Sequence, residues 1–348
     1  MKIDVLSERA SCSHLSWANN FEFEDVLAST CGARVISPTQ YWSHTRWEPV
    51  TGRLRKGRYR KVRDEGDLGG DLLVVVAMGP PALKMLNALP HWRKRYGRVV
   101  AYVPDMYPPS DEMLDMSLVN QLDTLFISYS QMVDRIGSRT STPVRLLQQA
   151  ADVLSGLPPR GERPIDVTAF GRQPGDILEA LAEQLSWPHS PLLGWWSSGA
   201  IPYSRSPQRD RASFLALLRA SKATLCFRFE DTNPHQYQGV SPFTARWFEA
   251  AAAGAAILGS QPSCPEASDV TIIQTIPLPT KGEEALAELQ ARLNDGSVAL
   301  TAKENLLRAC RHHDWRHRAA SLLEDVGFEI PDQLKNEMQE LHMFAEKL

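Results

Sequence analysis

The sequence alternates between short apolar runs and longer amphipathic stretches. The apolar runs are rich in Val, Ile and Leu and have the length of β-strands, whereas the stretches between them have the spacing of helices. Buried strands that alternate with helices are typical of a mostly parallel sheet. In the first half we expect strands at 2–6, 33–36, 72–77, 98–103, 124–128 and 144–147, and helices at 21–29, 81–89 and 131–136.

The alternation breaks at 157–164, where three prolines and a glycine stand among charged residues, a composition typical of a linker. The same rhythm then restarts. In the second half we expect strands at 165–169, 192–196, 223–229, 255–258 and 270–275, helices at 176–185, 210–219 and 242–253, and helices alone from 283 onward.

This pattern predicts an α/β protein of two Rossmann-like doubly wound domains with a helical C-terminal tail. The expected division is an N-terminal domain at 1–157, a linker at 158–164, a C-terminal domain at 165–318 and C-terminal helices at 319–348 that cross back to the N-terminal domain. We expect the two domains to face a ligand cleft at the carboxyl ends of their sheets. Because many functions share this architecture, function must be argued from the site.

Composition narrows the class of protein. The 348 residues suit two domains of about 150–170 residues each. The net charge of −3 argues against a general polyanion binder. Five scattered cysteines without a CxxC pair argue against a disulfide framework and a structural zinc site. The N-terminus does not resemble a signal peptide, and no apolar run reaches the ~20 residues of a membrane span. We therefore expect a cytoplasmic protein, with peripheral contact at the inner membrane surface left open.

The most informative stretch is 241–258, which follows a predicted strand and the polar loop 230–240. Ser241 is a suitable N-cap and Pro242 a suitable first helical residue, with Thr244 in the same turn. The free amides and the positive end of the macrodipole at such a helix start form a site for a phosphate group.

Arg246 and Glu249 lie three residues apart in this helix and therefore share one face. An arginine there can bind phosphate through two hydrogen bonds, while a carboxylate accepts from ribose hydroxyls. The alternative is a surface helix with one Arg–Glu ion pair, and the spacing alone does not decide between them.

The same stretch resembles the signature of the group 1 GT-B glycosyltransferases, in the branch with the pattern R-x-x-E-A-x-A-x-G. Further resemblances follow in the family's order: AFGR at 169–172, LLRASKATLCF at 217–227 and HDWRHRAASLL at 313–323. The first half resembles the family only in its alternation of strands and helices. This includes LLQQAADV at 146–153, where the chain of such proteins exits the acceptor domain.

The resemblance implies a nucleotide-sugar donor, with Glu249 on the ribose and Arg246 and Arg172 on the diphosphate. We then expect Glu249→Ala to abolish donor binding and leave the fold intact. Many retaining members carry a glutamate at the position of Ser241. Its replacement leaves the sugar contact, and hence retention of configuration, open.

We expect no metal and no cofactor besides the nucleotide sugar, which is a substrate. The sequence has no Asp-x-Asp metal motif, and GT-B enzymes offset the charge of the leaving diphosphate with helix dipoles and arginines. His312, His313 and His317 stand among arginines, a poor environment for a cation.

A catalytic base, if one is used, belongs in the N-terminal domain. Asp105 follows a predicted strand, where doubly wound folds place functional groups, and it is our first candidate. Its alternative role is that of a turn or capping residue. His14, after the first strand, is the second candidate, and its alternative role is that of an exposed loop residue.

The segment 46–63 has a local net charge of +7, because eight arginines and lysines oppose Glu48 alone. It is either a solvated loop or a segment that binds an anionic acceptor, an anionic membrane or a nucleic acid. The residues that we assign to acceptor binding are Arg55, Lys56, Arg58 and Arg60.

The leading hypothesis is therefore a metal-independent glycosyltransferase that moves a sugar from a nucleotide-sugar donor to an anionic or lipid-linked glycan, as in polysaccharide biosynthesis. One alternative is glycosylation of a nucleic-acid base or a small metabolite, with nucleic acid the less favoured partner. The other is a non-catalytic domain that binds nucleotide sugar or serves as a scaffold.

Overall fold

The computed structural model describes residues 1–12, 14–39, 59–62, 67–159, 161–196, 206–233 and 237–348. By their contacts the residues form two units, each built on one parallel sheet. The first unit comprises Met1–Ser13, Asn20–Gln148 and Ser321–Leu334, and the second comprises His14–Asn19, Gln149–Ala320 and Lys335–Leu348.

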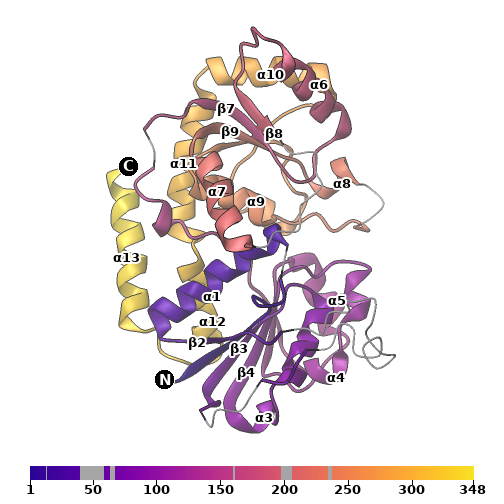
Figure 1. Ribbon diagram of the computed structural model, residues 1–348, viewed down its shortest axis with the longest axis vertical. Helices are drawn as coiled ribbons and strands as arrows, with labels where there is room; N and C mark the ends of the chain where they lie inside the picture. Colours follow the sequence, from indigo (N-terminus) through magenta and orange to yellow (C-terminus); the bar gives the residue numbers. More distant parts are fainter. Residues whose placement is uncertain (13, 40–58, 63–66, 160, 197–205, 234–236) are drawn as a thin grey trace. The chain divides into compact units, whose positions relative to one another are not determined.

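The sheet of the first unit has six parallel strands in the order β2-β1-β3-β4-β5-β6. Helices lie on both sides of it, α1 on one and α4 and α5 on the other (Figure 1). Because both faces are covered, the run Leu72 to Val76 of the central strand β3 is wholly apolar and almost fully buried. The strands are β1 (Ile3–Ser7), β2 (Arg34–Ile36), β3 (Gly70–Val76), β4 (Tyr96–Val103), β5 (Thr124–Ile127) and β6 (Val144–Leu146). The helices are α1 (Ala18–Cys31), α3 (Trp92–Arg95), α4 (Met116–Val119) and α5 (Val133–Gly137), with 3-10 turns η2 (Pro80–Ala88), η3 (Ser110–Met113) and η4 (Ser130–Met132).

The sheet of the second unit has five parallel strands in the order β11-β10-β9-β7-β8. The strands are β7 (Ile165–Ala169), β8 (Gly194–Trp196), β9 (Ser221–Cys226), β10 (Ala256–Gly259) and β11 (Ile276–Pro277). The helices are α6 (Gly175–Ser186), α7 (Pro207–Arg219), α8 (Phe229–Thr232), α9 (Ala245–Ala252), α10 (Gly282–Asn294), α11 (Ser297–His312), α12 (Trp315–Asp325) and α13 (Asp332–Lys347), with turns η1 (Leu15–Trp17), η5 (Leu154–Gly156) and η6 (Pro265–Ser268). Parts of α1, α12 and α13 belong to the first unit.

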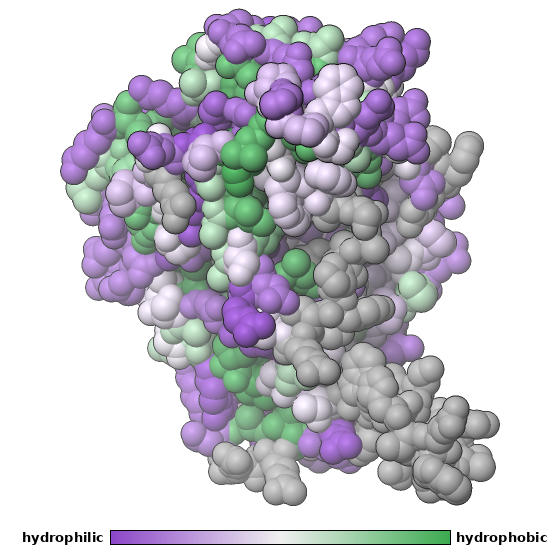
Figure 2. All heavy atoms as spheres, turned by 45° about the horizontal axis from the view of Figure 1, so that its top comes forward, coloured by the Kyte–Doolittle hydropathy of each residue, from purple (hydrophilic) through white to green (hydrophobic). Residues whose placement is uncertain are grey.

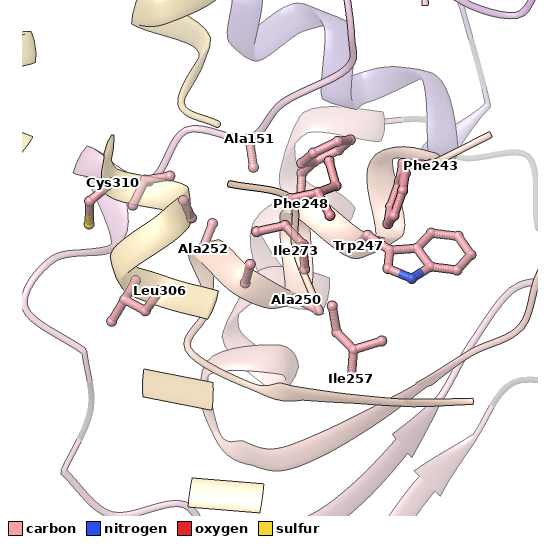
Figure 3. Packing of buried hydrophobic residues seen from close by; sticks show 14 of the residues in the cluster. Ala151, Phe243, Trp247, Phe248, Ala250, Ala252, Ile257, Ile273, Leu306 and Cys310 are labelled. Carbon is pink, nitrogen blue, oxygen red and sulfur yellow. The ribbon is translucent and has the colours of Figure 1, made fainter. Parts of the chain in front are cut away.

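Alternate residues of these strands bury two separate hydrophobic clusters, one on each face of the sheet. On one face Leu225 and Leu258 pack with α6 and α10. On the other face Cys226 and Ile257 pack with α9 and α11, around the fully buried Trp247 (Figure 3). The alanines of α9 allow this helix to lie close to the sheet.

Asp314 joins the start of α12 to the chain segment that precedes β7. Its carboxylate accepts hydrogen bonds from the backbone amides of Val153 and Leu154 and from Arg316. The Arg316 guanidinium also pairs with Asp152 and Glu337. This network, in which Asp314 is fully buried, anchors the start of α12 and part of α13 to the segment before β7.

The expected α/β class and the helical C-terminal region are confirmed. One predicted strand, 270–275, is wrong. Ile272 and Ile273 are apolar because they enter the cluster around Trp247, and the side chain of Asn305 bonds both backbone groups of Gln274 in place of a neighbouring strand. The helix predicted at 242–253 also begins later, at Ala245.

Within the part of the chain that the structure describes, no helix combines the length and the apolar composition of a membrane span. On the face drawn in Figure 2, apolar areas are interspersed with hydrophilic residues.

Candidate functional site

Charged residues of the second unit lie at the carboxyl ends of two strands, Arg172 after β7 and Glu230 after β9. Gly171 follows β7 with a φ of +68°, a left-handed conformation that suits glycine and turns the chain toward Arg172. After β9 the chain enters α8, and then residues 237–244 lead into α9. In doubly wound folds this edge of the sheet is where ligands bind.

The N-terminus of α9 has an unused hydroxyl. Thr244 is the N-cap and has extended backbone geometry, yet its side chain makes no capping hydrogen bond. The residue is 8% exposed, and its Oγ1 has no hydrogen-bond partner in the described part of the chain. A buried hydroxyl without a partner is unfavourable. An anion at the helix start, where the first amides are also free, would supply the missing contact.

Arg246 joins the ends of two strands. Its Nη1 donates to the carbonyl of Arg172 at 2.8 Å, and its Nη2 donates to the carbonyl of Phe227 at 3.2 Å. The guanidinium also lies over Trp247. Burial lowers the pKa of Arg246, but an arginine stays charged at neutral pH. The structure thus places a buried positive charge in the first turn of α9.

Arg172 is an exposed cation on an aromatic platform. Phe229 and Tyr237 stack with ring centroids 3.8 Å apart, and the Arg172 guanidinium carbon lies 4.3 Å from the Phe229 centroid. Its Nη1 also donates to the Tyr237 hydroxyl at 2.6 Å. These contacts restrict the side chain before any ligand arrives, which lowers the entropy cost of binding an anion.

Glu249 lies in α9 and pairs with Arg211 of α7. Arg211 Nη1 donates to Glu249 Oε1 at 2.6 Å, and both side chains are buried. The sequence reasoning missed Arg211, because the two residues are 38 positions apart and no motif connects them.

Ser241 is not the N-cap, contrary to the prediction. Its hydroxyl is fully buried and donates instead to Glu230 Oε2 at 2.5 Å, while Ser263 Oγ donates to Glu230 Oε1 at 2.8 Å. A carboxylate from α8 therefore stands beside the position where the sequence lacks one. The sequence reasoning missed Glu230 too, since it treated 230–240 as a loop.

The two candidate bases lie in different units. Asp105 follows β4 in the first unit, where its Oδ1 accepts from the Tyr129 hydroxyl at 3.2 Å. His14 precedes η1 and is grouped by its contacts with the second unit. Partial burial lowers the His14 pKa, and its ring lies 5.2 Å from that of Trp17. The catalytic role of both residues stays a prediction.

A buried carboxylate that the sequence reasoning missed lies near Asp105. Glu8 follows β1 and accepts from the Tyr59 hydroxyl at 2.6 Å and from the Met78 amide at 2.8 Å. Burial raises its pKa. The Asp105 amide donates to the carbonyl of the same Met78, so both carboxylates stand at one edge of the first sheet.

The acceptor assignment falls mostly outside the described residues. Arg55, Lys56 and Arg58 lie outside them. Arg60 is described, and its backbone amide donates to the carbonyl of Thr39.

The histidines near the C-terminus are engaged in the fold. His313 accepts from Arg318 at one ring nitrogen, so its other nitrogen donates to the Thr271 carbonyl at 2.9 Å. His317 bonds the Cys310 carbonyl at 2.9 Å. Among the described residues, no group of three or more histidine, cysteine or acidic side chains could hold a metal ion.

These histidines predict a loss of stability in acid. Burial lowers the pKa of His313 to about 3 and that of His317 to about 4, against about 6.5 in the unfolded chain. Below pH 6.5 the unfolded state therefore binds more protons, and the free energy of unfolding falls as the pH drops toward 4. His313→Gln, which keeps a donor and an acceptor, should remove about 2 kcal/mol of the loss between pH 6.5 and 5.

The measurement is urea unfolding at both pH values, with the exposed His189→Gln as the matched control. An unchanged pH dependence in His313→Gln would show that His313 already accepts a proton in the folded state.

Comparisons with known proteins bear on the family and the fold. Residues 159–324 match the glycosyl transferase-like family. No curated protein matches the sequence. Among solved structures, sucrose-phosphate synthase from Thermosynechococcus elongatus is similar over 94% of this chain and 98% of its own, with 13% identity and a TM-score of 0.51. HepE from Anabaena, in complex with UDP and glucose, is similar over 94% of this chain and 99% of its own, with the same identity and TM-score. At this identity the similarity shows the fold, which is GT-B.

Proposed function

Residues 159–324 match the glycosyl transferase-like family in a chain with the GT-B fold, and from this premise we propose that the protein transfers a sugar from a nucleotide-sugar donor bound at the start of α9. The observation that carries the proposal is the buried Thr244 hydroxyl, which lacks a partner in the described part of the chain at a helix N-terminus. The HepE structure holds UDP and glucose, which supports a nucleoside diphosphate as the leaving group.

The donor is held by residues of α9 and of the turn after β7 in this proposal. The diphosphate binds the first amides of α9, Thr244 Oγ1 and the Arg172 guanidinium. Arg246 adds buried positive charge in the first turn of the helix. Glu249 accepts from the ribose hydroxyls. As the bond to the sugar breaks, negative charge develops on the diphosphate, and these fixed dipoles and cations stabilise it without a metal ion.

The acceptor is an anionic or lipid-linked glycan in this proposal. Its support is the charge of the segment 46–63, which attracts anions at long range. That segment lies in the N-terminal half of the sequence, whereas the residues of the donor site belong to the second unit.

A thermal-shift screen against UDP-, GDP- and ADP-sugars tests donor binding. A nucleotide sugar at 100 times its dissociation constant stabilises the folded protein by about 2.7 kcal/mol. We expect the nucleotide sugars of one base, and not those of the other two, to raise the melting temperature of the protein in the presence of EDTA. No shift with any nucleotide sugar would contradict the proposal, and a shift that requires Mg²⁺ or Mn²⁺ would contradict its metal independence.

The basic segment predicts a salt-dependent acceptor affinity. Replacing Arg55, Lys56, Arg58 and Arg60 together with serine should raise the acceptor KM and flatten its dependence on salt. The reason is that the attraction acts over a Debye length of about 8 Å at physiological ionic strength. Steady-state kinetics with membrane or glycan extracts, at low and high salt, measure the effect.

The donor KM is the internal control for the quadruple variant and should not change. Normal acceptor kinetics at low salt would mean that the segment is a solvated loop.

A further inference from the structure

A buried ion pair fixes the orientation of the carboxylate that we assign to the ribose. Arg211 Nη1 donates to Glu249 Oε1 at 2.6 Å, and the two side chains are 6% and 5% exposed. The other arm of the guanidinium, Nη2, donates to Asn19 Oδ1 at 2.9 Å. Asn19 is itself held, because its Nδ2 donates to the carbonyl of Ala150 at 3.3 Å. Three contacts in series thus connect the backbone at Ala150 to Glu249.

Stability alone is a weak reason for this arrangement. Two charges lose their hydration when they are buried, and apolar replacements of a buried pair are often as stable or more stable. The neighbouring Arg209 illustrates the contrast, since it stands on the same helix, is 83% exposed and lies 3.9 Å from Asp210. A rigid guanidinium held at both ends is instead suited to set the position of its carboxylate partner.

Among the described residues, one oxygen of Glu249 has a hydrogen-bond partner and the other has none. Oε1 accepts from Arg211, whereas Oε2 has no hydrogen-bond partner among the residues that the structure describes. A carboxylate oxygen is an acceptor, and the two hydroxyls of a ribose are donors. The pair therefore leaves one oriented acceptor in the helix whose N-terminus carries the unused Thr244 hydroxyl.

We propose that Arg211 is a positioning residue of the donor site, which holds Glu249 so that Oε2 meets the ribose hydroxyls, and that Asn19 holds Arg211 in turn. This inference rests on the proposed function. It assigns to Arg211, Glu249 and Asn19 the preference for a ribonucleotide over a 2′-deoxyribonucleotide.

The test is calorimetric titration with UDP, GDP and ADP and with their 2′-deoxy counterparts. The wild type should bind the ribonucleotide of one base about tenfold more tightly than the deoxyribonucleotide, because a hydrogen bond to a charged acceptor is lost. Arg211→Met should bring this ratio close to one, and Arg211→Lys should lower it partly. Affinity for the deoxyribonucleotide, which keeps the 3′-hydroxyl, should fall less than affinity for the ribonucleotide in each variant. Asn19→Ala should act in the same direction with a smaller effect.

Two further variants separate positioning from folding. Arg209→Met, on the same helix, is the matched control and should keep the wild-type ratio. In a Glu249→Gln background, Arg211→Lys should cause no additional change in the ratio, because Arg211 acts through Glu249. If Arg211→Met does not fold, the affinity ratio is measured instead in Arg211→Lys and in the double variant Arg211→Met/Glu249→Gln, which removes both charges.

The outcomes distinguish this inference from the proposed function. A wild type that binds none of these nucleotides overturns the proposed function and the inference with it. A wild type that binds the ribonucleotide and the deoxyribonucleotide with equal affinity overturns the inference alone. So do Arg211 variants that keep the wild-type ratio of these two affinities.

Discussion

Replacing Glu249 with alanine is expected to destabilise the second unit strongly as well as to abolish nucleotide binding. The alanine leaves the Arg211 guanidinium buried without its carboxylate. Breaking a buried ion pair by removing one partner costs about 3–5 kcal/mol. From the sequence alone we expected this variant to keep its fold, and the structure changes that expectation because it reveals Arg211. Denaturant unfolding followed by circular dichroism measures the loss.

Glu249→Gln separates the two effects. Its amide oxygen still accepts from Arg211, so the fold should be retained. The loss of charge should weaken nucleotide binding by about 1.5–3 kcal/mol. An alanine variant as stable as the wild type would mean that water reaches Arg211 and that the pair is not buried in solution.

Gly259→Ala is expected to be the most destabilising single substitution in the second sheet. Gly259 ends β10 with a φ of +146°, a conformation that residues with a side chain rarely adopt. A Cβ there would lie 2.0 Å from the Cys226 carbonyl oxygen, which belongs to the paired strand β9. Because neither strand can move without breaking the sheet, we expect a loss of about 4 kcal/mol or more.

Gly175→Ala is the matched control for this substitution. Gly175 is the first residue of α6, and a Cβ there would meet no atom within 4 Å. We expect the free energy of unfolding to change by no more than about 0.5 kcal/mol. Similar stability of the two alanine variants would contradict the geometry at the end of β10.

The sequence predicts the strands well where burial on both faces makes them continuously apolar. The run at 72–77 corresponds to β3, Gly70–Val76, which lies between β1 and β4. The same signal fails at 270–275, since a loop that packs into a core is also apolar. The start of α9 was misplaced because Ser241 and Pro242 fit the rules for a helix start, whereas the Ser241 hydroxyl is used by Glu230.

In the candidate site too, local sequence patterns predict some of the residues, and only the structure reveals the others. Arg246 and Glu249 are predicted from their spacing within one helix together with the family resemblance, and Arg172 is predicted from the resemblance of residues 169–172. Other residues of the site come from distant parts of the chain: Arg211 of α7 bonds Glu249, Asn19 of α1 bonds Arg211, and Glu230 of α8 bonds Ser241. No local pattern marks these residues, because only the fold brings them to the site.

Release of nucleoside diphosphate from a nucleotide sugar tests the central claim most directly. Wild-type protein is incubated with UDP-, GDP- and ADP-sugars in EDTA, with and without acceptor extracts, and Glu249→Gln serves as the control. The proposed function predicts release with one of these donors that acceptor accelerates and that Glu249→Gln reduces about tenfold or more. Binding of a nucleotide sugar without release under any of these conditions would contradict glycosyl transfer and favour a non-catalytic binding domain.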